Sequence, residues 1–331
     1  MPSARRRHLD GVQAGHATHP GLWLDRFLPS HDTDEAKRQH HVDACRVPEP
    51  VLYAESFARW EQLLAAFGAE TRLGRVDGRM VVGLGNESVL ETSITLHRTY
   101  GVPFIPGSAL KGLAASYARQ ALGPEWSSPS EAYRLLFGDT TSAGHVVFHD
   151  ALYVPGSGHA ATGGDGRPRA LYPDVVTVHH PDYYQTGRTP PADWDSPTMI
   201  HLLSATGTYL LALSGPPDWR QAAFGVLDLA LAELGVGAKT SSGYGRLAFV
   251  QPGADEPSVQ AMLAEIANLP IGQVAPRVPG IAARWSSLEA TPAGRRLVAQ
   301  AIVDKVAQAG RYERSRDTTW YREIVAFLEG A

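Results

Sequence analysis

The residues best suited to chemistry lie in one glycine-rich stretch, Gly235 to Leu247, which has the sequence GVGAKTSSGYGRL. Glycines let backbone N–H groups approach an anion closely. Lys239, Thr240, Ser241 and Ser242 supply further hydrogen-bond donors in the same stretch. The pattern therefore indicates a phosphate-binding loop, although a flexible connection between a helix and a strand would explain the same composition equally well.

A nucleotide-binding P-loop is the first specific alternative, because it needs G-x-x-x-x-G-K-[ST] between a strand and a helix. Ala238 stands where the glycine before the lysine should be, and Glu233 stands where the first glycine should be. The stretch also follows a helical pattern and precedes GYGRLAFV, which alternates like a strand. Dinucleotide sites require strand, loop and helix in that order. A nucleotide-dependent enzyme is therefore the remotest function class, and we expect no cofactor.

The charge of the chain is mildly acidic overall but locally basic. The formal net charge of -4 argues weakly against a nucleic-acid partner, since binding to phosphates is driven largely by lysine and arginine. No acidic residue lies between Glu91 and Glu125, however, and this segment contains Arg98, Lys111 and Arg119. The glycine-rich stretch likewise contains Lys239 and Arg246 without an acidic neighbour, and these two segments are the candidates for anion contacts.

The single cysteine and the hydropathy of the chain indicate the cellular compartment of the protein. Cys45 alone excludes an intramolecular disulfide and a cysteine-based zinc site, which fits a reducing compartment. No apolar run approaches the roughly 18 residues that a membrane span needs, and the basic N-terminus has no apolar segment behind it. We therefore expect a cytoplasmic protein without a membrane partner.

Histidines are the remaining candidates for catalysis or metal binding. His97 precedes Arg98 in the acid-free segment and could act as a general base near neutral pH, although a phosphate contact or a packed histidine is the more common role. His145, His149 and Asp150 lie close together in sequence, but no third ligand position is fixed. We therefore expect neither a metal site nor catalytic residues.

Periodicity predicts an α+β fold. Strands are predicted as a pair within 79–98, turning at Gly85 and Asn86, and at 145–154, 207–215 and 243–250; helices are predicted at 50–68, 108–121 and 218–235. From Leu90 to Val250 the order is strand, helix, strand, long insertion, strand, helix, strand. This is the β-α-β-β-α-β order of a ferredoxin-like domain, which RNA-recognition modules also use.

Three parts of the chain flank or interrupt this predicted domain of residues 46–252. Residues 1–45 show no long period and predict a loosely structured arm, whereas residues 253–331 have a helical pattern and predict a C-terminal extension. Residues 155–200 form an insertion with little periodicity. Its aromatic residues Tyr183, Tyr184 and Trp194, with Arg188, suit stacking against RNA bases, but they could equally hold the loop to itself.

Four motifs together resemble a known family. IPGSALKGLAASYA and GVGAKTSSGYGRL resemble the first-helix motif and the C-terminal glycine-rich loop of the RAMP proteins of CRISPR systems. GLGNESVLETSITLHRTYGVPFIPGSALKG and DVVTVHHPDYYQTGRTPPADWDSPTMIHLL are more specific, and they resemble the sixth-numbered subunits of type III-B, or Cmr, effector complexes. The resemblance extends from about Gly21 to Val250 and covers the insertion.

The resemblance implies a single ferredoxin-like RAMP domain that binds guide RNA (crRNA) near its 3′ end and supports target RNA binding. The implied RNA contacts are Arg98, Ser108, Lys111, Gly237, Lys239, Thr240, Ser241, Ser242, Gly243 and Arg246. The implied partners are a backbone RAMP, a small helical subunit and a neighbouring RAMP. The insertion would be a thumb that carries His179, Tyr183, Tyr184 and Arg188, although Val178 and His180 depart from the family pattern.

The resemblance also bears on catalysis. Backbone RAMPs cut target RNA with an acidic residue in the loop after their first strand, and residues 92–124 of this chain contain no carboxylate. A structural, non-catalytic subunit is therefore expected. The alternative is a RAMP endoribonuclease that uses His97.

Overall fold

The computed structural model describes residues 11–15, 18–30, 32–127, 130–160, 168–188, 190–195, 197–250, 253 and 257–329. The chain divides into two compact units, Met1–Phe249 and Val250–Ala331. Each unit has its own hydrophobic core, and the described core residues of one do not recur in the other.

A mixed helix and sheet structure forms the first unit, as the sequence predicts. Its main sheet has the strand order β10-β1-β9-β4-β2, and β3 pairs with β9 beside this path. The strands are β1 Glu70–Asp77, β2 Phe104–Ile105, β3 Val147–Phe148, β4 Ala151–Tyr153, β9 Thr208–Ser214 and β10 Arg246–Val250. β9 pairs antiparallel with both β1 and β4, and nearly all of its residues are buried, so it is the centre of the core.

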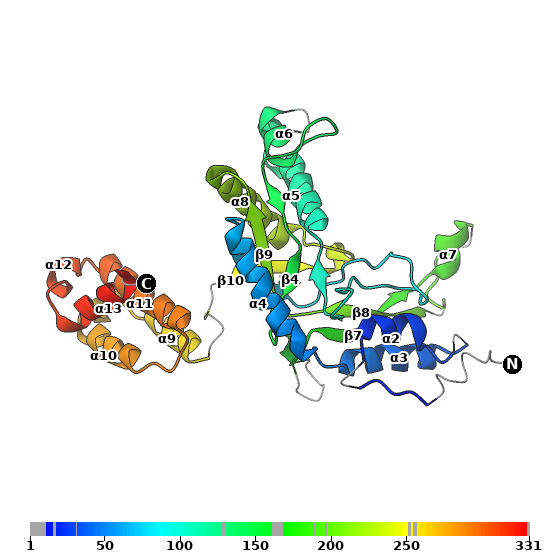
Figure 1. The fold of residues 1–331 in the computed structure, drawn as a ribbon, viewed down its shortest axis with the longest axis horizontal. Helices are drawn as coiled ribbons and strands as arrows, with labels where there is room; N and C mark the ends of the chain where they lie inside the picture. The colour runs from blue at the N-terminus through cyan, green and yellow to red at the C-terminus, as the bar shows by residue number, and fades with distance from the viewer. Residues whose placement is uncertain are drawn as a thin grey trace. The chain divides into compact units, whose positions relative to one another are not determined.

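Two long helices pack side by side against this sheet (Figure 1). α5 (Gly107–Ala121) and α8 (Pro217–Glu233) lie close to the positions predicted from their apolar spacing. α5 begins one residue before the predicted start at 108, and its N-cap is Pro106. The short helix α6 (Glu131–Phe137) is capped by Ser130, whose side chain accepts a hydrogen bond from the Tyr133 N–H.

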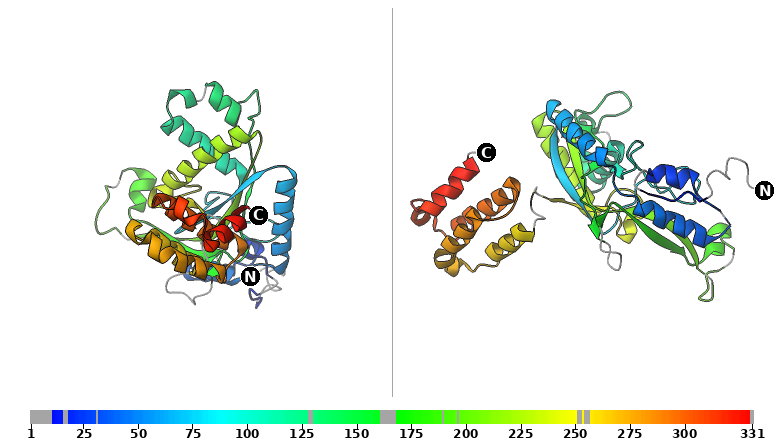
Figure 2. Two further views of the ribbon diagram at one scale, coloured as in Figure 1. Left: turned by 90° about the vertical axis from the view of Figure 1, so that its left-hand side faces the viewer. Right: turned by 60° about the horizontal axis from the view of Figure 1, so that its bottom comes forward.

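A long hairpin extends from the sheet beside the N-terminal helices. β7 (Leu171–Val178) and β8 (Thr198–Ala205) pair antiparallel along their whole length, and helix α7 (Pro181–Thr186) lies near their far end (Figure 1). α2 (Pro20–Arg26) and α3 (Asp34–Arg46) lie along this hairpin (Figures 1 and 2). The predicted loose arm is therefore wrong for residues 20–26 and 34–45, which are helical, and the predicted insertion contains the regular strand β7 and the start of β8.

The two strands predicted within 79–98 do not form as regular strands, and the first strand of the sheet along the chain is β1 instead. The Thr95 N–H nevertheless donates to the Val82 carbonyl and the Ser93 N–H donates to the Leu84 carbonyl, so two hydrogen bonds join the two predicted arms. The segment also makes the isolated bridges Met80↔Ala205 and Leu96↔Pro103. The alternation of apolar and polar residues in this segment reflects burial of one side only. Thr92 is buried, and the Thr92 hydroxyl donates to the His201 carbonyl of β8 at 2.9 Å. β1 was missed because it is rich in charged residues. The guanidinium of Arg72 stacks over the Phe224 ring of α8 at 4.2 Å, which lets a charged residue occupy a strand position.

The helix α4 (Val51–Ala66), which matches the helix predicted at 50–68, and four short elements complete the first unit. The short elements are the 3-10 turns η1 Pro124–Trp126 and η2 Thr240–Ser242, and the two-residue strands β5 His159–Ala160 and β6 Pro168–Arg169. Cys45 in α3 is buried, and this burial raises the pKa of its thiol to about 12.

Between residues 257 and 329, the second unit is built from helices. They are α9 Pro257–Ala267, α10 Val274–Ser286, α11 Pro292–Gln308, α12 Tyr312–Ser315 and α13 Thr319–Glu329, with the short turn η3 Ile271–Gln273. Val298 and Ile302 of α11 and Ile324 of α13 are fully buried in its core. Among the helices that the structure describes, none is long and apolar enough to cross a bilayer.

Candidate functional site

The glycine-rich loop between α8 and β10 has a backbone that few other sequences could adopt. Gly235, Gly237, Gly243 and Gly245 all have positive φ angles, between 74° and 94°. Lys239 has a φ of 59°, and no other non-glycine residue in the described part of the chain has a positive φ. Left-handed backbone costs an ordinary residue free energy, so this loop is held by its surroundings.

The segment that follows β1 supplies those surroundings. The Ala238 N–H donates to the Val81 carbonyl at 2.7 Å, and the Gly245 N–H donates to the Arg79 carbonyl at 2.8 Å. The Val236 N–H closes the loop by donating to the Gly245 carbonyl at 2.8 Å. These bonds fix the loop, and a freely flexible connection is therefore the poorer interpretation.

Several donors of this fixed loop remain open. The backbone N–H groups of Gly237, Lys239, Thr240 and Ser241 have no hydrogen-bond acceptor among the described residues. Three of them are consecutive, at the point where the left-handed Lys239 leads into η2. Successive N–H groups in such a turn form a concave site for an anion. Lys239 and Ser241 are exposed, so an anion could reach this site from solvent.

Tyr244 connects the loop to the hairpin. Its hydroxyl donates to Asp174 Oδ2 of β7 at 2.9 Å, and burial together with this contact raises the pKa of the phenol to about 12. Arg79 lies beside it, with its guanidinium over the Tyr172 ring at 4.3 Å and donating to Ser204 Oγ at 3.2 Å. These three contacts between the loop, Arg79 and the hairpin were not predicted from the sequence. The motifs that contain Tyr244 and Asp174 were visible, but their pairing depends on tertiary structure.

Arg246 has a structural partner. Its guanidinium donates to the Ala232 carbonyl in the last turn of α8 at 2.9 Å, which satisfies a free helix-end acceptor. Its predicted RNA contact therefore depends on the two guanidinium nitrogens that do not take part in this hydrogen bond.

The first turn of α5 presents the second group of predicted contacts. Ser108 is exposed and Lys111 is half-buried, and neither has an ion-pair or hydrogen-bonding side-chain partner among the described residues. Asp150 fixes the turn, because its Oδ1 accepts a hydrogen bond from the Gly107 N–H at 2.7 Å. The predicted contacts of this turn and those of the glycine-rich loop come from separate elements, and no described hydrogen bond joins the two.

The tip of the β7–β8 hairpin presents its aromatic side chains to solvent. Tyr184 is 73% exposed and Trp194 is 87% exposed, so neither holds the loop to itself. Tyr183 packs edge-on against Tyr184 with 5.5 Å between ring centroids. His179 and Arg188 are also exposed.

A hydrogen bond closes the base of this tip. His180 Nδ1 lies 2.9 Å from Asp195 Oδ2, and this hydrogen bond lowers the pKa of the Asp195 carboxyl. The Ala192 N–H donates to the same carboxylate oxygen at 3.1 Å. His180, which departs from the family pattern, therefore has a local structural role.

The other histidines have ordinary packing partners. His149 Nε2 lies 2.9 Å from Ser214 Oγ, and His145 stacks on Trp219 with 6.2 Å between ring centroids. In the part of the chain that the structure describes, no three metal-ligating side chains cluster.

His97 lies in a turn, where its Nδ1 accepts a hydrogen bond from the Thr99 N–H at 3.2 Å. Its ring packs against Tyr100 and Phe104. Burial lowers its pKa, so the imidazole is neutral near pH 7. A neutral ring whose Nδ1 accepts a hydrogen bond carries its proton on Nε2. His97 could therefore donate a proton to a ligand but has no free basic nitrogen.

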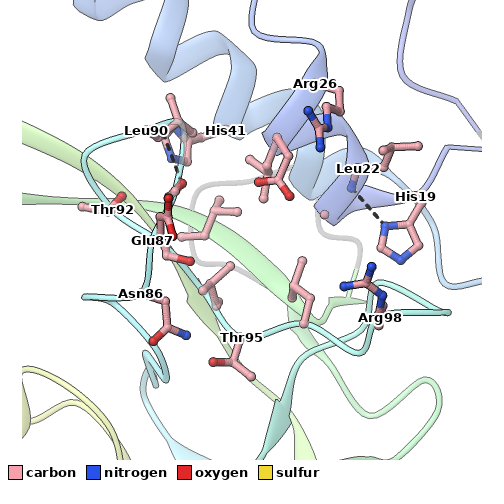
Figure 3. Close-up of a pocket in the computed structure, with 18 of the residues that line it drawn as sticks. His19, Leu22, Arg26, His41, Asn86, Glu87, Leu90, Thr92, Thr95 and Arg98 are labelled. Carbon is pink, nitrogen blue, oxygen red and sulfur yellow. Dashed lines mark hydrogen bonds between the residues drawn. The ribbon is translucent and has the colours of Figure 1, made fainter.

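Arg98 lines a pocket of about 740 Å³ in the first unit (Figure 3). The pocket lies between α2, the segment that contains residues 86–98, and the hairpin strand β8. Arg98 is thus separated from the other predicted RNA contacts, none of which lines this pocket.

Comparisons with known proteins agree with the resemblance. The model of the RAMP superfamily matches residues 75–248. The chain is 31% identical over 253 residues to the CRISPR system Cmr subunit Cmr6 of Pyrococcus furiosus, an alignment that covers 59% of this chain and 72% of that protein.

Two solved structures are also similar to this chain. A chain in the cryo-EM structure of the type III-B Cmr-beta bound to cognate target RNA has a TM-score of 0.52 at 19% identity, covering 66% of this chain and 72% of that one, and this likeness concerns the fold alone. The crystal structure of Cmr6 from Pyrococcus furiosus is 32% identical over 55% of this chain and 98% of that one, with a TM-score of 0.35.

Proposed function

The chain belongs to the RAMP superfamily, with a Cmr6 protein of a type III-B CRISPR system among its relatives, and from this premise we propose that it binds guide RNA as a structural subunit of such a complex. It would cap the backbone near the 3′ end of the guide and support target RNA binding. Its neighbours would be a backbone RAMP, a small helical subunit and another RAMP.

The observation that carries this proposal is the fixed glycine-rich loop with its open donors. Its three consecutive N–H groups suit one phosphate, and the Lys239 ammonium adds a positive charge beside them. The first 249 residues contain three lysines, of which Lys37 is paired with Glu91. Lys111 and Lys239 have no acidic partner among the described residues, so both are available to phosphates.

The topology supports a ferredoxin-like assignment. Along the chain, β1, α5, β4, β9, α8 and β10 follow one another in β-α-β-β-α-β order, although β2, β3 and the β7–β8 hairpin interrupt it. The domain limits that we propose are 46–252 for the RAMP domain and 253–331 for the helical extension.

We propose that the β7–β8 hairpin with its tip is the thumb. Exposed tyrosine and tryptophan rings near an arginine suit stacking against unpaired bases. The Tyr244–Asp174 hydrogen bond would position this thumb relative to the phosphate-binding loop.

Binding of labelled guide RNA by the purified chain tests the proposal. Lys239→Ala and Lys111→Ala should each weaken binding by a similar factor for unrelated RNA sequences, and should each flatten the log–log salt dependence by about 0.7 to 1. Lys305→Ala is the matched control, because Lys305 lies in the helical unit and donates to the Ala267 carbonyl. A loss confined to one RNA sequence would contradict phosphate binding by these lysines.

Cleavage by the assembled complex tests the non-catalytic role. Every target cut should survive His97→Ala, because the basic nitrogen of His97 is already engaged. Loss of one specific cut in a fully assembled complex would instead support the endoribonuclease alternative.

A further inference from the structure

The pocket that contains Arg98 has one end rich in donors (Figure 3). His19 Nδ1 accepts a hydrogen bond from the Leu22 N–H at 3.1 Å, which leaves Nε2 as the ring nitrogen that carries a proton. This Nε2 is buried and has no acceptor in the described part of the structure. Figure 3 shows the His19 ring next to the Arg98 guanidinium, with Arg26 on the same side of the pocket. Neither arginine has a carboxylate partner among the described residues.

The opposite end presents acceptors. Figure 3 shows Asn86 and Glu87 across the pocket from His19 and Arg98. Both side chains are exposed, and Glu87 makes no ion pair with a described cation. Asp25 also lines the pocket, and its carboxylate would repel an anion while accepting hydrogen bonds from hydroxyl groups.

Apolar side chains also line the pocket. They are Leu24, Leu90, Ile94, Leu96, Phe104 and Leu203. Leu90, Ile94 and Leu96 belong to one segment of the chain. This segment is held in place, because the Ser93 N–H donates to the Leu84 carbonyl at 3.1 Å and the Thr95 N–H donates to the Val82 carbonyl at 2.7 Å. The pocket is therefore preformed, which lowers the cost of binding.

We propose that this pocket binds one nucleotide. The phosphate would lie between His19, Arg98 and Arg26, where donors are in excess, and the base would lie on the apolar side chains. Glu87 would accept hydrogen bonds from N–H groups on the edge of the base, and Asp25 would accept from the ribose hydroxyls. A carboxylate suits guanine best, because guanine presents two adjacent N–H donors on that edge.

The volume agrees with this class of ligand, since small-molecule sites of about 300–1,000 Å³ are typical and this pocket measures about 740 Å³. The nucleotide could be part of an RNA strand or free in solution. The first source rests on the proposed function, and the second does not.

Equilibrium binding of GMP, AMP and inorganic phosphate to the full chain tests the proposal. GMP should bind saturably, and about tenfold more tightly than AMP. Arg98→Ala and Arg26→Ala should each weaken GMP binding at least tenfold, and Glu87→Gln should reduce the preference for GMP over AMP. Arg59→Ala is the matched control, because Arg59 is an exposed arginine of α4 outside the pocket.

Competition distinguishes the two sources. A short guanylate-containing oligoribonucleotide should displace labelled GMP from the wild-type chain if the pocket holds a nucleotide of RNA, and should leave GMP bound if it holds a free nucleotide. Absence of saturable GMP binding, equal binding by Arg98→Ala, or equal affinity for inorganic phosphate would overturn the proposal. RNA binding that still depends on Lys239 in that case would leave the proposed function standing.

Discussion

Gly237 and Gly243 share a left-handed backbone but differ in their surroundings, with φ angles of 94° and 88°. A Cβ at Gly237 would lie 2.2 Å from the Val81 carbonyl oxygen, whereas one at Gly243 would meet nothing within 4 Å. Gly243→Ala should therefore cost only the backbone strain of about 1–2 kcal/mol. Gly237→Ala should lower the free energy of unfolding further, as measured by urea denaturation. Equal losses would show that the Val81 segment can move away from the loop.

The buried histidines of α3 predict a dependence of stability on pH. Burial lowers the pKa of both His40 and His41 below the ordinary value of 6.5. As the pH falls below about 6.5, the unfolded chain binds protons before the folded chain does, so stability is full above this pH and decreases below it. Each histidine contributes a slope of up to about 1.4 kcal/mol per pH unit.

Urea denaturation between pH 7.5 and pH 5.5 measures this slope. His41→Asn keeps a donor for the Lys37 carbonyl, which His41 Nδ1 contacts at 2.8 Å, but it cannot titrate. The variant should therefore show a shallower dependence than the wild type. An unchanged slope would assign the dependence to other groups.

At the scale of elements, the β7–β8 hairpin should be separable into a structural base and a functional tip. Val178 pairs directly with Thr198, so an Asn-Gly turn could replace residues 179–197 without changing the register. We expect this variant to keep the melting temperature of the first unit and to lose affinity for guide RNA, because the exposed aromatic residues are removed.

A substitution at the base provides the contrast. Leu202 in β8 is fully buried, and Leu202→Ala should cost about 2–5 kcal/mol of stability. If the tip replacement lowered the free energy of unfolding of the first unit as much as Leu202→Ala does, the tip would be part of the core and the thumb proposal would fail.

Helices and the central strand were predictable from the sequence, whereas the elements that frame the site were not. α5 and α8 have regular apolar spacing and β9 is an almost unbroken buried run, because each packs directly on the core, and their predictions are confirmed. β7 and β8 alternate weakly, since their outer halves are exposed and carry Val175 and Met199 on the surface.

Tertiary contacts explain the remaining errors. The alternation of Leu90, Thr92, Ile94 and Leu96 reflects one wall of a pocket and not a paired strand. The glycine-rich loop was predictable as a motif, but its anchoring to Arg79 and Val81 joins segments more than 150 residues apart. RNA binding by the individual residues of this loop stays a prediction.

For the whole molecule, the separate cores predict separate unfolding. Ile302 is fully buried in the core of the second unit, and Leu211 is fully buried in that of the first. Scanning calorimetry of the full chain should show two transitions. Ile302→Ala and Leu211→Ala should each cost about 2–5 kcal/mol and should each lower one transition only. A single transition that both substitutions lower would show that the two units unfold together.

The burial of Cys45 also has a practical consequence for labelling. Cys45 is the only cysteine of the chain, is 3% exposed, and has a thiol whose pKa is raised to about 12. Maleimide reagents attack thiolates, so this side chain should remain unmodified at neutral pH. A Trp194→Cys substitution would then provide the one reactive thiol, at a position where the native side chain is 87% exposed. A fluorophore attached there would report, in real time, the arrival of guide RNA at the hairpin tip.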